Sequence, residues 1–380
     1  MGTGAQGLEA DADFLQLFRR EIASRRIPFT GSLELTRRCN LRCVHCYCGD
    51  QDSIREAQGE ELSSNRWMSL LDELAEAGCL DLLFSGGEPM LRRDFPALFA
   101  HAKKLGMIVT VFCNGTLVDD RVLDVFRDLP PLLVEVSLYG AAVETHERVT
   151  QSPGSYRRMR EGVDRLLAAG LRVGLKTVLM TINRAEYAAI ERLADSLGVS
   201  WRSDSALFPC LPNQDSGARP NVCGSCSGAE SVLDYRVPED EAAALECSRA
   251  SRTDALRRAW ENTSRPVTDA LYTCGSGLTG FHLDPYGGLQ PCLMATGYRE
   301  SAVELGFAEA WRRIARIREV RAPEGYACNR CDLQPLCSGC PALFDLENGN
   351  PAVRSEYICS LAQQRFARIS SGQQTAVLSR

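Results

Sequence analysis

Short β-rich runs alternate with amphipathic helical stretches between residue 31 and about residue 208. This alternation is typical of a parallel sheet covered by helices. The predicted strands lie at 32–37, 80–85, 107–112, 133–138, 171–178 and 199–207. The predicted helices lie at 63–77, 94–105, 119–128, 154–169 and 183–196. Their expected N-caps are Ser63, Asp94, Asp119 and Asn183. Six strand–helix units are too few for a closed eightfold barrel, so we expect an α/β fold with a parallel sheet.

Three closely spaced cysteines follow the first predicted strand: Cys39, Cys43 and Cys46. Thiolates at this spacing can hold three irons of one cubane cluster, which leaves the fourth iron open to another ligand. A zinc knuckle or a redox pair is the alternative. Zinc sites usually combine a Cys-x2-Cys pair with a distant second pair, so the spacing favours an iron–sulfur cluster.

Composition narrows the functional classes. With 380 residues, 44% of them hydrophobic, the chain is long enough for two domains. The net charge is −6, and the scattered Lys and Arg residues form no basic stripe for nucleic acid. No apolar run approaches the roughly 18 residues of a membrane span, and residues 1–30 do not resemble a signal peptide. The 17 cysteines are therefore interpreted as metal ligands of a cytoplasmic protein rather than as disulfides.

The motif Cys39-x3-Cys43-x2-Cys46 resembles the cluster motif of the radical S-adenosylmethionine (radical SAM) enzymes. A second motif supports the resemblance, because Gly86-Gly87-Glu88-Pro89 follows the strand at 80–85, where that family carries its methionine-binding turn. The resemblance implies a partial (β/α)6 TIM barrel over 31–235, after an N-terminal extension at 1–30. It also implies a [4Fe-4S] cluster that takes an electron from a flavodoxin or ferredoxin. That cluster splits SAM into methionine and a 5′-deoxyadenosyl radical, which removes hydrogen from the substrate.

The resemblance also implies which residues contact SAM, near the C-terminal ends of the strands. They are Gly86, Gly87, Glu88 and Pro89 at the methionine, Asn114 near the adenosine, Ser137 at the ribose and Arg148 at the carboxylate. His45 fills the position where relatives place an aromatic residue that packs against adenine.

The chain departs from the family pattern after the fourth strand. Relatives often carry Asp-Gly there, and an Arg four residues past a His. This chain has Tyr139-Gly140, and Thr150 at that offset from His146. A solvated, helix-capping Arg148 is therefore the alternative to a ligand. His101 and His282 have no partner visible in the sequence and are interpreted as surface or packed histidines.

A second group of cysteines occupies the C-terminal third: Cys274, Cys292, Cys328, Cys331, Cys337, Cys340 and Cys359. It resembles the SPASM domain, which holds one or two auxiliary [4Fe-4S] clusters, here over 263–380 after a linker helix at 236–262. Two residues separate Cys337 from Cys340, where three are commoner. A zinc ribbon over 328–340 is the alternative, but the number of soft ligands favours clusters.

The family arrangement implies two ligand sets. Cys328, Cys331, Cys337 and Cys359 would close one cluster, and Cys274, Cys292 and Cys340 would hold the other. The second set is one ligand short unless Cys247, Cys210, Cys223 or Cys226 completes it. An open iron that binds substrate is the other possibility.

The segment 209–230 is rich in Pro, Gly, Asn and Ser, so it reads as a loop at the mouth of the barrel. Its Cys210 is the one candidate catalytic residue. The alternatives for this thiol and for Cys223 and Cys226 are a cluster ligand, a hydrogen-atom donor, a substrate clamp or an incidental loop cysteine.

Radical SAM enzymes with SPASM domains most often modify peptides, by crosslinking, epimerisation or oxidation. We therefore expect a radical SAM oxidoreductase that matures a ribosomal peptide. Residues 1–30 are too short for a leader-binding domain, so a separate leader-binding protein is an expected partner. The alternatives are a small-molecule radical SAM enzyme, for alcohol dehydrogenation or tetrapyrrole modification, and a non-enzymatic electron carrier or zinc scaffold.

Overall fold

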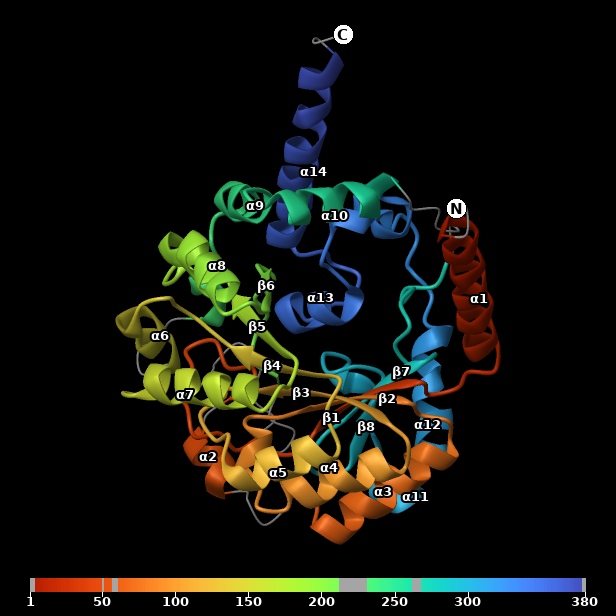
Figure 1. Ribbon diagram of the computed structural model, residues 1–380. Coiled ribbons are helices and arrows are strands. Elements are labelled where there is room, and N and C mark those ends of the chain that lie inside the picture. Colours follow the sequence, from red (N-terminus) through yellow and green to blue (C-terminus); the bar gives the residue numbers. More distant parts are fainter. Residues whose placement is uncertain (1–3, 50, 57–60, 212–230, 262–267, 378–380) are drawn as a thin grey trace.

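One mixed sheet runs through the molecule with strand order β6-β5-β4-β3-β2-β1-β7-β8-β9 (Figure 1). The computed structural model describes residues 4–49, 51–56, 61–211, 231–261 and 268–377. The strands between residues 30 and 204 are β1 (Thr30–Glu34), β2 (Asp81–Ser85), β3 (Ile108–Cys113), β4 (Leu133–Ser137), β5 (Val173–Val178) and β6 (Ser200–Asp204). Each pairs in parallel with the next. All six predicted strands and the α/β fold with an incomplete barrel are confirmed.

Helices connect these strands, and Figure 1 shows α3, α4 and α5 in a row along one side of the sheet. The predicted helices are present as α3 (Ser64–Glu76), α4 (Phe95–Lys104), α5 (Asp120–Asp128), α7 (Ser155–Ala168) and α8 (Tyr187–Ser196). Ser63 and Asp119 cap α3 and α5 through their side chains, as predicted. Asp94 and Asn183 occupy N-cap positions, but their side chains make no capping hydrogen bond. Sequence reasoning missed α2 (Gln51–Glu56) and α6 (Val143–Thr150).

The two faces of the sheet differ in polarity because successive strand residues point to opposite sides. Residues such as Leu33, Leu82 and Val134 face the helices and belong to the main hydrophobic core. The alternate residues form the opposite face, which we call the inner face. It carries Ser32, Glu34, Ser85, Phe112, Glu135, Ser137, Lys176 and Arg202. Most of these side chains are polar. The inner face from β1 to β6 therefore differs from the apolar face that packs against the helices.

The C-terminal third continues the same sheet. β7 (Gly280–Leu283) pairs in parallel with β1, and β8 (Gly288–Gln290) and β9 (Glu300–Ser301) follow antiparallel. The remaining helices are α9 (Glu239–Cys247), α10 (Ala250–Glu261), α11 (Ala302–Leu305), α12 (Phe307–Ile314), α13 (Pro341–Asn348) and α14 (Glu356–Val377). The linker expected at 236–262 is thus two helices. The domain boundaries at 30, 235 and 262 remain predictions.

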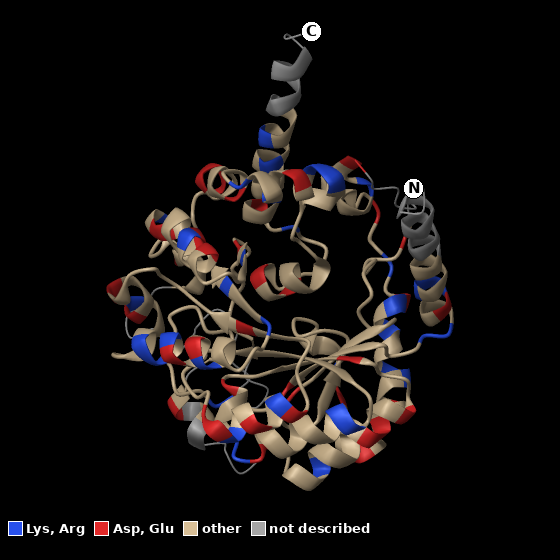
Figure 2. Cartoon of the chain, in the orientation of Figure 1, with Lys and Arg blue, Asp and Glu red and all other residues tan. Residues whose placement is uncertain are grey.

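Acidic and basic side chains are intermixed over the outer helices, as Figure 2 shows. The N-terminal helix α1 (Gly4–Ser24) lies at the margin of the molecule, and α14 projects from it (Figure 1). Within the described residues, no helix has both the length and the apolar character that a membrane crossing requires.

Candidate functional site

The loop after β1 carries Cys39, Cys43 and Cys46, and the two helices that the sequence did not reveal hold it. At the start of α2, the Gln51 side chain accepts a 2.6 Å hydrogen bond from the Cys39 N–H and donates to the Arg37 carbonyl at 3.2 Å. The N–H groups of Arg42 and Val44 donate to carbonyls at the end of α6, both at 3.0 Å. The Cys46 N–H closes a turn on the Cys43 carbonyl at 3.1 Å.

The three thiols lie close enough to influence one another. Burial raises the pKa of Cys39 to about 12, and the negative charges of Glu88 and Cys46 contribute. Burial also raises the pKa of Cys43 well above its ordinary value, and the charges of Cys46 and Cys39 raise it further. In the described chain, no three His, Cys, Asp or Glu side chains converge on one metal ion. A cubane binds each thiolate to a different iron, so its ligands surround a group of atoms rather than one atom.

The turn at 86–89 packs directly on the cysteine loop. A Cβ on Gly86 would lie 2.4 Å from the Thr36 carbonyl oxygen, and one on Gly87 would lie 2.5 Å from the carbonyl oxygens of Arg37 and Arg38. Gly86 also has φ +148°, in the region that favours glycine. The Gly87 N–H donates to the Thr36 carbonyl at 2.7 Å. Only glycine permits this approach between the two motifs.

Buried hydrogen bonds of Glu88 connect the turn to the end of β3. Its carboxylate accepts hydrogen bonds from the backbone N–H groups of Met90 at 3.1 Å and Asn114 at 2.7 Å. Burial raises the pKa of Glu88 to about 7, although these two donors favour its ionised form. The Asn114 amide donates to Asn40 at 2.8 Å and lies 3.7 Å from the Cys39 sulfur. The structure therefore brings the cysteine loop, the glycine turn and Asn114 together.

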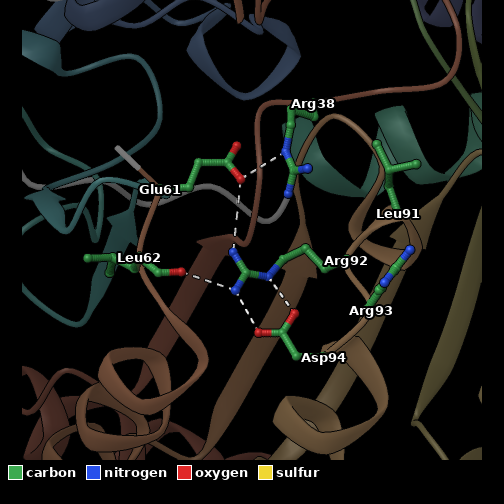
Figure 3. Close-up of a pocket in the computed structure, with 7 residues that line it drawn as sticks. All are labelled: Arg38, Glu61, Leu62, Leu91, Arg92, Arg93 and Asp94. Atoms are coloured by element: carbon green, nitrogen blue, oxygen red, sulfur yellow. Dashed lines mark hydrogen bonds and ion pairs between the residues drawn. The ribbon is translucent and has the colours of Figure 1, made fainter. Parts of the chain in front are cut away.

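A network of charged residues lies around a pocket of about 560 Å³ (Figure 3). It contacts the segments next to the glycine turn and the cysteine loop. The Arg92 guanidinium binds Asp94 at 2.7 Å and the carbonyls of Leu35 and Leu62 at 3.1 Å. Buried Glu61 accepts from the Arg37 N–H and from Arg38, both at 3.1 Å. These contacts tie the segment after the turn to residues that directly precede Cys39.

Ser137 and His45 lie near one another through Tyr139, whereas Arg148 lies elsewhere. Ser137 ends β4 on the inner face and hydrogen-bonds Tyr139. The His45 ring packs edge-on against Tyr139 with 4.7 Å between centroids. Arg148 is exposed on α6. Its assignment to the SAM carboxylate remains a prediction.

Histidines that looked isolated in the sequence have partners in the fold. His146 accepts from the Tyr139 N–H at 3.3 Å. His282 on β7 lies 2.8 Å from the Ser32 hydroxyl and 3.8 Å from buried Glu34, across the β1–β7 pair. His101 binds Asp72 at 2.7 Å on the surface. The interpretation of His101 and His282 as surface and packed residues agrees with these positions, but neither lacks a partner.

Charged residues on the inner face were not found by sequence reasoning. Arg202 on β6 binds both oxygens of Glu135 on β4, at 2.8 and 2.6 Å. Between them on β5, the Lys176 ammonium lies 3.6 Å from the centroid of the Phe112 ring. Burial lowers the pKa of Lys176 to about 8, against the charge of Glu135. The available signal was the single charged residue in β4 and in β5, whereas β6 carries both Arg202 and Asp204.

Cys210 lies against the cysteine loop. Its thiol donates to the Cys46 carbonyl at 3.3 Å, and the neighbouring Leu211 N–H donates to the Tyr47 carbonyl at 2.9 Å. The loop after β6 therefore covers the end of the cysteine motif. Cys223 and Cys226 fall outside the described residues.

Charge effects among the C-terminal cysteines fall into two groups. Burial raises the pKa of Cys337, and the charges of Cys328, Cys359 and Cys331 raise it further. Burial likewise raises the pKa of Cys340 to about 11, with contributions from Cys292 and Cys274. The assignment of these cysteines to two cluster ligand sets remains a prediction. Cys247 lies on α9 beside Glu246 and Thr253.

Comparison with known proteins places this geometry in context. Residues 33–197 match the model of the radical SAM superfamily. The AdoMet-dependent heme synthase of Oleidesulfovibrio alaskensis is 28% identical over 81% of this chain and 81% of its own length. A PqqA peptide cyclase of Granulibacter bethesdensis is 30% identical over 44% of each chain. The structure of Streptococcus suis SuiB bound to precursor peptide SuiA superposes with a TM-score of 0.66, 15% identity and coverage of 91% of this chain and 81% of SuiB.

Proposed function

From the match of residues 33–197 to the radical SAM superfamily model, we propose that this chain cleaves SAM and modifies a peptide substrate with the resulting radical. The observation that carries the proposal is the contact between the glycine turn and the cysteine loop. Gly87 and Glu88 donate backbone hydrogen bonds to the carbonyls of Thr36 and Arg38, at 2.7 and 2.9 Å. Each motif fixes the position of the other, as one shared cofactor site requires.

The residues present fit a [4Fe-4S] cluster and SAM. Cys39, Cys43 and Cys46 supply three thiols in one loop, and a cluster with three protein ligands leaves one iron open. When bound, the cluster supplies the electron that splits SAM to methionine and a 5′-deoxyadenosyl radical. The turn from Gly86 to Pro89 would hold the methionine end, and Asn114 and Ser137 would contact the nucleoside.

We further propose two auxiliary [4Fe-4S] clusters. Cys328, Cys331, Cys337 and Cys359 would complete one, and Cys274, Cys292 and Cys340 would hold three irons of the other. The mutual influence of the thiols within each group supports this division. A flavodoxin or ferredoxin as reductant and a separate leader-binding protein belong to the same proposal.

A peptide substrate is supported by the PqqA peptide cyclases, whose resemblance covers 44 to 47% of this chain. A tetrapyrrole is the second candidate. It is favoured by the AdoMet-dependent heme synthases, whose resemblance extends over 81 to 88% of this chain. Both substrates present carbon–hydrogen bonds to a radical held within van der Waals reach.

The two candidates can be separated in one assay. Reconstituted enzyme, dithionite and SAM are incubated with short peptides encoded beside this chain or with Fe-coproporphyrin III. The true substrate should raise 5′-deoxyadenosine formation well above the uncoupled rate, because correct positioning accelerates abstraction. A peptide should also lose hydrogens or take up solvent deuterium. Stimulation by the porphyrin alone would replace the peptide proposal with the tetrapyrrole.

A further inference from the structure

Lysine is rare in this chain. It occurs only at Lys103, Lys104 and Lys176, and arginine provides every other basic residue. Lys103 and Lys104 lie in the last turn of α4, where cations favour the helix C-terminus. Lys176 instead lies on the inner face of the sheet. An ammonium and a guanidinium are not interchangeable, because the ammonium is a compact point charge and the guanidinium a planar fork.

The Lys176 ammonium has an aromatic face beneath it but no anionic partner. It lies 3.6 Å from the Phe112 ring centroid, and within the described ranges no hydrogen bond or ion pair reaches its Nζ. The carboxylate on the adjacent strand is already engaged, since Arg202 binds both oxygens of Glu135. An aromatic face compensates only part of the desolvation of a cation. An unpaired charge inside a fold is costly, so such groups mark places where a ligand completes the set.

A second cation, Arg202, lies at the same register position on the adjacent strand. Lys176 and Arg202 are partners in the β5–β6 register, and Phe112 and Glu135 are partners in the β3–β4 register. The Arg202 guanidinium lies 5.4 Å from the same Phe112 ring. Glu135 occupies two of the five donors of this guanidinium, which leaves others free to bind. Arg202 is also half-exposed on the inner face.

We propose that Lys176 and Arg202 bind a carboxylate of the substrate on the inner face of the sheet. The ammonium donates to one oxygen and the remaining N–H groups of Arg202 to the other. Glu135 is a positioning residue that orients Arg202, and Phe112 holds the ammonium in place. The inference rests on the proposed function, because it requires the substrate to enter the face that the SAM site borders.

The carboxylate has two sources among the candidate substrates. In a peptide it would be an Asp, Glu or C-terminal carboxylate, and in a tetrapyrrole it would be a propionate arm. SAM is a third source of a carboxylate. Burial lowers the pKa of Lys176, but the charge of Glu88, in the proposed SAM-binding turn, raises it, so the turn lies near this lysine. The test therefore includes SAM alone as a separate condition.

Acylation of lysine can locate the carboxylate because only three lysines compete. Anaerobic holoenzyme with SAM is treated briefly with N-hydroxysuccinimidyl acetate, and acetylation at each lysine is measured by mass spectrometry. The probes are coproporphyrin III with its tetramethyl ester, and acetyl-Ala-Glu-Ala-amide with acetyl-Ala-Gln-Ala-amide. One carboxylate probe should protect Lys176 from acetylation, and its neutral twin (the tetramethyl ester or the glutamine peptide) should not. The acetylation of Lys103 and Lys104 should remain unchanged. The proposal is overturned if neutral twins protect equally, if no carboxylate protects, or if SAM alone protects as fully.

A binding measurement decides the matter if Lys176 resists acylation. Calorimetric titration with the same probes compares wild type, Lys176→Met, Lys176→Arg and the matched control Lys104→Met. We expect Lys176→Met to weaken carboxylate binding about tenfold, the factor that corresponds to one lost charge-assisted contact of about 1.4 kcal/mol. Neutral twins should bind every variant alike, and Lys104→Met should equal wild type. Equal carboxylate affinity in Lys176→Met and wild type would overturn the site. Neither measurement needs turnover, so failure of the radical reaction would be seen separately.

Discussion

The Glu88 carboxylate accepts a 2.7 Å hydrogen bond from the backbone N–H of Asn114. With a second bond from the Met90 N–H, it joins the glycine turn to the end of β3 without using a backbone group of Gly86 or Gly87. The Glu88 side chain is fully buried. It therefore stabilises the contact between the loops that follow β2 and β3 rather than serving as an exposed ligand.

Glu88→Ala should destabilise the protein and weaken SAM binding together. The substitution leaves two buried N–H groups without an acceptor, which costs about 1–3 kcal/mol for each. Glu88→Gln retains an acceptor oxygen and should lose less. The midpoint of thermal unfolding and the KM for SAM measure the two effects. Glu76→Ala, at an exposed position on α3, serves as the control and should change neither.

Arg365→Met should be strongly destabilising. Arg365 on α14 binds both oxygens of Glu246 on α9, at 2.7 and 2.8 Å, and donates to the Leu336 carbonyl beside Cys337. Both side chains are almost completely buried. Removing one partner of a buried pair leaves an uncompensated charge, at a cost of about 3–5 kcal/mol. The double variant Arg365→Met/Glu246→Leu should recover part of that loss in denaturant unfolding. Additive losses would contradict the pairing.

Iron content should report the two C-terminal groups independently of the SAM cluster. After anaerobic reconstitution, Cys39/Cys43/Cys46→Ala should retain about seven to eight irons per chain, the content of two four-iron clusters. Replacing Cys328, Cys331, Cys337 and Cys359 by Ala as well should remove about four more. Stoichiometric zinc without residual iron would instead support the zinc scaffold for this region.

Lys176 should make stability depend on alkaline pH. Its pKa falls from 10.5 to about 8 on folding because burial disfavours the charged form. The unfolded chain then binds more protons between these values, so the stability of the folded protein rises with pH across that window. Lys176→Met lacks this cost, which is roughly 3 kcal/mol at most. Thermal midpoints should therefore favour the variant at pH 7, and the difference should shrink towards pH 10. A constant difference across this range would contradict a lowered pKa at Lys176.

The sequence revealed the strands because their apolar runs are separated by helices with recognisable ends. Ser63 and Asp119 cap their helices as local chemistry predicts, whereas the Asp94 carboxylate is taken up by Arg92 and Ser64. Helix α6 was missed because eight residues with polar composition show no clear period. The pairing of β7 with β1 joins segments about 250 residues apart, and no local pattern encodes such a contact.

The sequence predicted only those residues of the site that belong to a short motif. Cys39, Cys43 and Cys46 stand within eight residues of one another, and their turn partner has a recognisable glycine pair. Glu135, Lys176 and Arg202 come from three different strands, and each alone reads as an ordinary polar position. Their role becomes visible only when strand register places them side by side.

The most direct test of the central claim is 5′-deoxyadenosine formation by the anaerobically reconstituted enzyme with dithionite and SAM. The wild type and a Cys79→Ala control should both form it, because Cys79 lies in the hydrophobic core and belongs to none of the proposed cluster sets or their candidate ligands. The Cys39/Cys43/Cys46→Ala variant should form none above the enzyme-free background. Equal 5′-deoxyadenosine formation in this variant and in the wild type would contradict the assignment of these three thiols to the SAM-cleaving cluster.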